Sequence, residues 1–186
     1  MMPRSVRATS EERTRHLPGD ELISRPLATL THAVTIERPR RDVWPWLLQM
    51  GAGRAGWYSY DALDNAGRHS ADLVVPDLLD VKVGTIMPAL PGETGGFVVL
   101  HIDPLRVLVL GWVPISGAEP VVSWAFVLDE PRKGATRLIV RVRGSSSYRP
   151  PFGLPRWSTK AIMPVVHLVM QRRQLLGIAQ RAESAH

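Results

Sequence analysis

Apolar and polar residues alternate along several short segments of the chain, a pattern typical of strands that bury one face. The first segment is THAVTIE, residues 31–37, in which His32, Val34 and Ile36 share one face. Further strands are predicted over residues 80–88, 96–102, 105–113, 121–129 and 136–144. Tight turns after residue 102 and around residue 134 would join neighbouring strands as antiparallel pairs.

The last predicted strand indicates which face of the sheet is buried. Leu138 and Val140 point to one side, whereas Arg137, Arg141 and Arg143 point to the other. One apolar and one polar face are typical of an antiparallel sheet that is covered on a single side. We therefore expect these arginines to face solvent, where replacing one by alanine would change the stability by no more than about 0.5 kcal/mol.

Helices are predicted before and after the run of strands. Pro39 favours a helix start, and the helix would end at Gly51. A short second helix is predicted over residues 60–67 and a long final helix from about Ser158 to Glu183. An apolar stripe along the final helix would cover the sheet. The stripe consists of Ile162, Val165, Val166, Val169 and Leu176.

The glycines of GAGRAGWYSYD, residues 51–61, match the spacing G-x-G-x-x-G of a dinucleotide-binding turn. That turn needs a strand before it and a helix after it, whereas Gly51 follows a predicted helix. We therefore interpret Gly51 as the end of that helix, and Gly53 and Gly56 as residues that allow the backbone to reverse. No dinucleotide cofactor is expected.

Composition limits the class of protein. The 186 residues suffice for one domain, predicted over residues 21–186 after a mobile polar tail, residues 1–20. Because the chain has no cysteine, disulfides, thiolate nucleophiles and cysteine-ligated metals are excluded. The net charge is +6, but the sequence has no nucleic-acid-binding motif, so no nucleic-acid partner is expected. The apolar segments are too short to span a membrane. We expect a cytoplasmic protein with no metal and no cofactor, and the oligomeric state stays open.

This order of elements resembles the helix-grip fold of the START-like, Bet v 1-like superfamily, also called SRPBCC. The resemblance covers residues 17–183. It is carried by THAVTIERPRRDVWPWLLQMG, GRAGWYSYD, DVKVGTIMP, SWAFVLDEPRKGATRLIVRVRG and MQRRQLLGIAQRAE. The GRAGWYSYD segment is similar to that of a bacterial subgroup without an assigned activity. The resemblance implies an α+β fold in which a curved antiparallel sheet of about six or seven strands wraps around a long C-terminal helix. A short helix pair would follow the first strand.

The resemblance also implies an internal cavity between the sheet and the last helix that accepts small apolar molecules. Aromatic, apolar and histidine side chains near that space are the candidates for ligand contact, and packing is the more common role for any one such residue. The candidates are Trp57, Tyr60, His101, Trp112, Trp124, Phe126, Val166, His167 and Met170. His101 with Asp103 could instead form an acid–base pair, or stabilise the end of a strand.

Three functions remain open at this point. The first is binding of a small hydrophobic molecule, such as a lipid, a quinone or a polyketide-like compound. The second is an enzyme of the polyketide cyclase or aromatase type, in which His101 or Tyr60 would handle protons, although no catalytic set is assigned. The third is a protein-interaction module that uses the apolar face of the last helix.

Overall fold

One six-stranded antiparallel sheet forms the centre of the molecule, with the strand order β1-β6-β5-β4-β3-β2. The computed structural model describes residues 5–92, 95–114, 119–147 and 163–185. The strands are β1 (Ala28–Ile36), β2 (Ile86–Pro88), β3 (Gly96–Asp103), β4 (Val107–Trp112), β5 (Val122–Arg132) and β6 (Ala135–Gly144). A strand overlaps each predicted range, but the one predicted over residues 80–88 is limited to Ile86–Pro88. The predicted antiparallel α+β class is confirmed.

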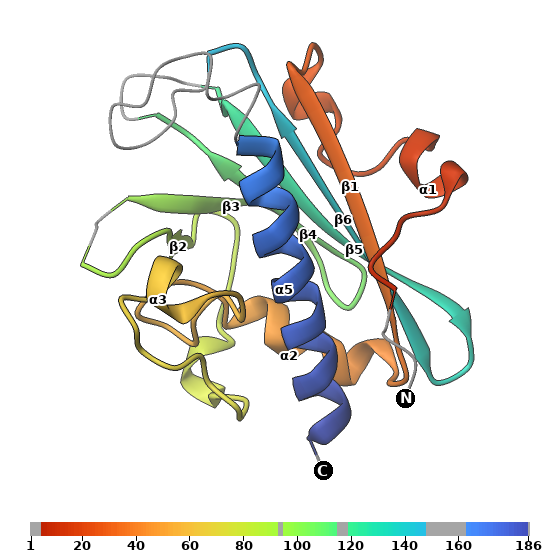
Figure 1. Cartoon of the computed structure of the whole chain (residues 1–186), viewed down its shortest axis with the longest axis vertical. Helices are drawn as coiled ribbons and strands as arrows, with labels where there is room; N and C mark the ends of the chain where they lie inside the picture. Colours follow the sequence, from red (N-terminus) through yellow and green to blue (C-terminus); the bar gives the residue numbers. More distant parts are fainter. Residues whose placement is uncertain (1–4, 93–94, 115–118, 148–162, 186) are drawn as a thin grey trace.

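The helices lie on both sides of this sheet. They are α1 (Ser10–Thr14), α2 (Arg40–Leu48), α3 (Asp61–Asp64) and α5 (Met163–Ser184), with short 3-10 turns at Glu21–Ile23 and Pro76–Leu78. Helix α5 crosses the inner face of the sheet, with α2 and α3 beside it (Figure 1). The predicted start of the last helix at Ser158 falls outside the described residues. Within the described part of the chain, no helix has the length and apolar content needed to cross a bilayer.

The inner face of the sheet and α5 together enclose the main core. Strands β1, β5 and β6 present their alternate apolar residues to it, including Val34, Phe126 and Val140, all of them almost fully buried. From α5 come Leu175, Ile178, Ala179 and Ala182, which recur at helical spacing.

The inward stripe of α5 differs from the predicted one. The structure turns His167, Met170, Gln171 and Gln174 toward the molecule, whereas Val165, Val166 and Val169 are 40–59% exposed. Residues that face the sheet must recur every three or four positions from Leu175 and Ile178, and the three valines lie off that row. The predicted core role of Val165, Val166 and Val169 is therefore wrong, and Ile162 lies outside the described residues.

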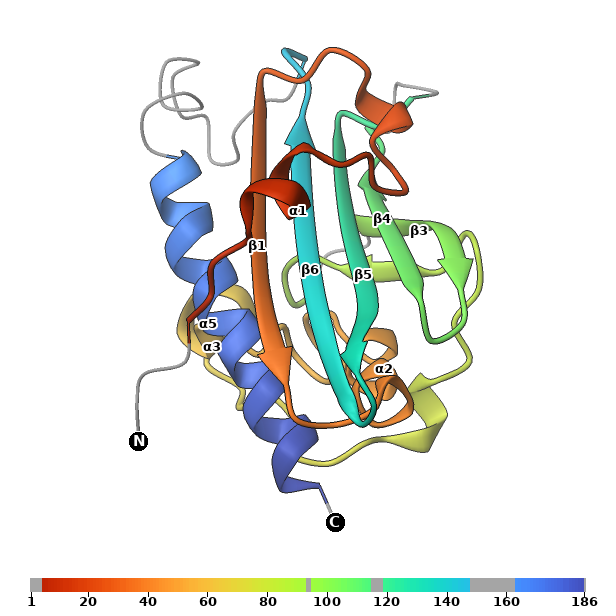
Figure 2. The same ribbon diagram turned by 90° about the vertical axis from the view of Figure 1, so that its right-hand side faces the viewer.

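The outer face of the sheet is covered by the N-terminal segment, as Figure 2 shows for α1. Ala8 and Leu17 are buried there against Ala33 of β1, Val127 of β5 and Ile139 of β6. The prediction of a mobile tail is therefore wrong for residues 5–20, and residues 1–4 are outside the described part.

Helix α1 has its own start signal within this segment. Thr9 caps it through a reciprocal pair of hydrogen bonds with Glu12, in which each residue's backbone N–H donates to the other's side-chain oxygen. Glu12 in turn accepts two hydrogen bonds from the Arg137 guanidinium, at 2.7 and 2.9 Å. This contact with Arg137 lowers the pKa of the Glu12 carboxyl.

The arginines of β6 point to the predicted outer face, but that face is not solvated. Arg141 is only 4% exposed, and its Nη1 donates to the Asp20 carboxylate at 2.6 Å. Its remaining donors reach Thr31 and the backbone oxygens of Arg15, Glu12 and Arg13. The expectation that Arg137, Arg141 and Arg143 face solvent is wrong. The N-terminal segment covers this face and supplies hydrogen-bond acceptors whose position could not be predicted from the composition.

The glycine-rich turn after α2 is a backbone reversal, as predicted. Gly51 and Gly56 form an isolated antiparallel bridge, and both have positive φ angles. At Gly56 a Cβ atom would lie 2.2 Å from Ser70 Oγ, so a side chain is excluded there. The turn brings the following residues, Trp57 and Tyr58, back under α5.

Candidate functional site

A cavity of about 170 Å³ lies between α5, the segment after the glycine-rich turn, and strands β3 and β5. One part of its wall is aromatic and apolar, and another is polar. The described lining residues are Trp57, Ser59, Asp64, Ala89, Phe97, Trp124, His167, Met170, Gln171 and Gln174.

The chain positions the first part of this wall through a strained residue. Tyr58 has a φ of 59°, which non-glycine residues rarely adopt, and is 2% exposed. Its hydroxyl accepts a hydrogen bond from Gln49 at 2.8 Å, and its ring lies against Trp46. Burial raises the pKa of the Tyr58 hydroxyl. Because Gly177 has no Cβ, α5 passes directly over Tyr58. The neighbouring residues Trp57 and Ser59 line the cavity, and the Ser59 hydroxyl donates to the Met170 backbone oxygen at 3.1 Å.

Three rings form the aromatic wall. Trp57 stacks on Trp124 with ring centroids 5.4 Å apart, and Phe97 meets both of them edge-on at 5.7 and 5.0 Å. Two more rings support this wall from outside the cavity lining. Trp112 contacts Phe97 at 5.4 Å, and Phe126 contacts Trp124 at 5.1 Å. Rings packed in this way are held rigidly and present large apolar faces to a ligand.

Two glutamines of α5 continue the wall. The indole N–H of Trp124 donates to Gln171 Oε1 at 3.1 Å, and Gln171 Nε2 donates to Gln174 Oε1 at 2.7 Å. Gln174 Nε2 then reaches only the sulfur of Met50, at 3.7 Å. Because sulfur is a weak hydrogen-bond acceptor, the Gln174 amide would form a stronger hydrogen bond with an oxygen or nitrogen acceptor of a ligand.

Asp64 is the one acidic residue among the described lining residues. It is 6% exposed, and its Oδ1 is buried without a hydrogen-bond partner among the described residues. Burial, and then the neighbouring Asp61 carboxylate, raise the pKa of Asp64 to about 6. Asp61 itself is satisfied, because Ser70 Oγ donates to it at 2.5 Å and His69 Nδ1 lies 3.2 Å away.

His167 approaches the cavity from α5. Its ring lies 6.3 Å from Trp124 and 6.2 Å from His32 of β1. Burial, followed by the charge on His32 when protonated, lowers the pKa of His167 to about 4, so the ring is neutral at pH 7. His167 Nε2 and His32 Nδ1 are both buried and have no hydrogen-bond partner in the part of the chain that the structure describes.

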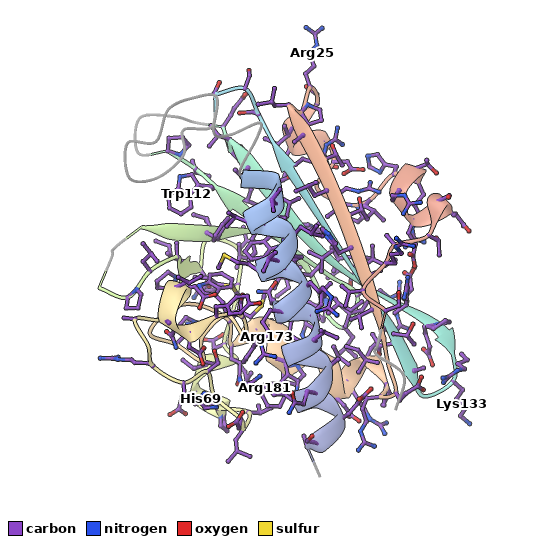
Figure 3. All side chains as sticks on the ribbon, in the orientation of Figure 1. Arg25, His69, Trp112, Lys133, Arg173 and Arg181 are labelled. Carbon is purple, nitrogen blue, oxygen red and sulfur yellow. The ribbon has the colours of Figure 1, made fainter. Side chains whose placement is uncertain are left out.

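The predicted ligand-contact residues fall into three groups. Trp57, Trp124, His167 and Met170 meet at the cavity, and Trp112 and Phe126 stand directly behind its aromatic wall. Figure 3 labels Trp112 near the end of β4. The structure does not bring the others to the cavity. These are Tyr60, His101 and Val166.

His101 is displaced by an irregularity in β3. The register with β4 shifts between Val99 and His101, so the alternation of faces changes there. Val99 and Ile102 pack on the inner core, whereas His101 is exposed. Regular alternation along β3 would place His101 on the face of Phe97 and Val99, and the register shift removes it from that face.

Several lining residues were not among the sequence candidates, namely Ser59, Asp64, Ala89, Phe97, Gln171 and Gln174. The sequence did contain evidence that the two glutamines face inward. They are three residues apart and lie on the same face of α5 as Leu175 and Ile178. Asp64 gave no such signal, because a short acidic turn is ordinarily exposed. Among the described residues, no group of three His, Cys, Asp or Glu residues could hold a metal ion.

Comparisons with known proteins find likeness in shape only. No protein-family model and no curated protein matches the chain. A crystal structure of protein MLL2253 from Mesorhizobium loti is 17% identical, with 86% of this chain and 99% of that one covered and a TM-score of 0.48. The Zhui aromatase/cyclase from Streptomyces sp. R1128 is 16% identical, with 84% and 93% covered and a TM-score of 0.45. Norcoclaurine synthase from Thalictrum flavum is 12% identical, with 92% and 95% covered and a TM-score of 0.43.

The architecture itself decides the fold. The sheet is antiparallel throughout, α2 and α3 follow β1, and α5 lies across the inner face. The chain therefore has a helix-grip fold, as the resemblance implied.

Proposed function

We propose that this protein binds a small, predominantly aromatic molecule in the cavity between α5 and the sheet. The observation that carries the proposal is the composition of the wall, in which three packed rings and Met170 face a few polar groups. Ligand sites in proteins typically combine an apolar surface with a small number of polar groups that fix the orientation of the ligand. This arrangement supports binding better than it supports a filled core.

The cavity volume indicates how large a part of a ligand the described residues can surround. An apolar cavity of about 150 Å³ is known to hold one benzene molecule. The volume of about 170 Å³ found here therefore suits one aromatic ring with a short substituent. The long acyl chain of a lipid would exceed the described cavity.

Binding can be tested with a panel of single-ring compounds, using indole, p-cresol and ethylbenzene as probes. Because Trp57 and Trp124 line the cavity, a bound probe should change their fluorescence. In the variant Ala89→Phe, a large side chain would occupy the cavity, and probe affinity should fall by about tenfold or more. Leu73→Phe is the matched control, since Leu73 is 75% exposed and is not among the described lining residues. The absence of binding by every probe, or equal affinity in Ala89→Phe, would contradict the proposal.

A second candidate function, an enzyme that moves protons on a bound molecule, is favoured by one observation. The same cavity holds Asp64, whose pKa is raised, and His167, whose pKa is lowered. With pKa values of about 6 and about 4, both groups are largely unprotonated at pH 7, so each of them can accept a proton from a bound molecule.

This second candidate predicts faster exchange of the protons next to the carbonyl of phenylacetone in deuterated water. Exchange measured by NMR should exceed that in buffer, and both Asp64→Asn and His167→Gln should reduce it. Asp77→Asn, at an exposed position of the neighbouring loop, should leave it unchanged. If the native protein binds phenylacetone but exchange does not exceed the buffer rate, the binding function stands without the catalytic one.

A further inference from the structure

The charge distribution around the cavity points to the chemical class of the ligand. The chain carries a net charge of +6, yet the described lining residues contain no lysine or arginine and one carboxylate, that of Asp64. The remaining polar groups of the lining are a neutral imidazole, a hydroxyl, two amides and the indole N–H groups of two tryptophans. A basic protein thus presents a locally acidic cavity.

Arg181 of α5 could neutralise the Asp64 carboxylate, but its guanidinium binds other groups. Arg181 of α5 pairs with Asp72 at 3.0 Å and donates to the backbone oxygens of Ala71 and Ser70. Its guanidinium also lies over the Tyr58 ring, 5.0 Å from the centroid. Figure 3 shows Arg181 in the lower half of α5, on the side of His69. Asp61, the other acidic residue of α3, has Ser70 and His69 as partners.

Among the residues that the structure describes, no cationic side chain pairs with Asp64, so its carboxylate lacks a counter-charge there. A buried, unpaired carboxylate oxygen is costly, and the cost is relieved when a positively charged donor arrives. The rings of Trp57, Trp124 and Phe97 lie in the same wall, and the negative faces of aromatic rings attract cations. Both features favour a cation over a neutral or anionic ligand of the same shape.

We infer that the cavity selects an arylalkylamine, in which a single ring packs on the Trp57, Phe97 and Trp124 wall and a protonated amino group on a short side chain pairs with Asp64. This inference rests on the proposed binding function and names the class of ligand. The amino group supplies the hydrogen bond that Asp64 Oδ1 lacks among the described residues. The Gln174 amide and the neutral His167 ring remain available for a substituent on the ring.

Three compounds of matched shape separate the contributions of ring and charge. These are 2-phenylethylamine, 2-phenylethanol and 3-phenylpropanoate, compared by calorimetry at pH 7.5. The amine should bind about tenfold or more tightly than the alcohol, and the carboxylate should bind most weakly. Asp64→Asn should abolish the advantage of the amine and leave the alcohol within about twofold of its native affinity, whereas Asp77→Asn should change neither.

A pH series on the native protein tests the same inference without a variant. Below the pKa of Asp64, about 6, the carboxyl becomes protonated, so affinity for the amine should fall between pH 7 and pH 5. The affinity for the alcohol should stay the same between pH 7 and pH 5. His167, with its pKa of about 4, stays neutral over this range, and Asp61 is the other carboxylate that acts on Asp64.

The outcomes are distinct. Equal binding of amine and alcohol, with no change in Asp64→Asn, would overturn the inference and leave the proposed binding function intact. Preference for the carboxylate would also overturn it. If none of the three compounds binds, and the probes of the preceding section fail as well, the proposed function falls together with the inference.

Discussion

Met170 is the side chain whose packing separates a ligand cavity from a filled core. It lies on the cavity lining and is partly exposed, whereas Met87 in the main core is fully buried. A methionine in a close-packed core loses contacts and leaves a void when it is truncated to alanine, whereas one beside an existing cavity loses fewer contacts.

We therefore predict that Met170→Ala lowers the free energy of unfolding by less than about 2 kcal/mol, and that Met87→Ala lowers it by about 2–5 kcal/mol. Urea denaturation followed by circular dichroism measures both values. A loss at Met170 as large as that at Met87 would mean that the site is packed like the core.

At the scale of elements, the N-terminal segment is a structural layer of the fold. Leu17 and Ala8 bury apolar surface on the outer face of the sheet, and Asp20 reaches Arg141 of β6 and Arg143 beside it. Arg141 therefore links the N-terminal segment to the sheet, because it donates hydrogen bonds to one carboxylate and several backbone oxygens of that segment.

Removal of the Arg141 side chain should be costly because Asp20 would remain buried with less compensation. We predict that Arg141→Ala lowers the free energy of unfolding by about 3–5 kcal/mol. Arg106→Ala, at an exposed arginine on the turn before β4, should change it by no more than about 0.5 kcal/mol. Similar small losses for both variants in urea denaturation would show that the segment contributes little to the stability of the sheet.

For the whole molecule, buried titratable groups make stability depend on pH in two opposing ways. His167 and His32 have pKa values below that of an unfolded histidine, so the unfolded state takes up protons first as the pH falls from about 6.5. This destabilises the folded protein in acid. Asp64 has its pKa raised to about 6, so the folded state takes up its proton first and gains stability between pH 6 and pH 4.

Variants at the two sites should separate these effects when unfolding is compared at pH 7 and pH 5. His167→Gln should reduce the destabilisation at pH 5 by about 2 kcal/mol. Asp64→Asn should increase it by about 1 kcal/mol because the compensating carboxyl is gone. A change of the opposite sign in either variant would mean that the pKa of that group is shifted in the other direction in the folded protein.

The sequence by itself determined the strands, the helices that follow β1 and end the chain, and the inner face of the sheet. Alternation in β1, β5 and β6 follows from the period of two along a strand, so Val34, Phe126 and Val140 could be assigned to one face. The Gly51–Gly56 reversal also follows from local chemistry, since only glycine adopts those angles readily next to Ser70. The resemblance added the helix-grip order, and the tertiary structure has it.

Only the tertiary structure decided which side chains form the cavity and which surfaces are covered. The bulge in β3 moves His101 away from the aromatic wall, and the direction of α5 selects Gln171 and Gln174 over Val166. Asp64 and Arg141 are buried by segments distant in sequence. The physical reason is that alternation fixes a side chain's face within its own element, whereas burial and pairing depend on the segments that pack against it.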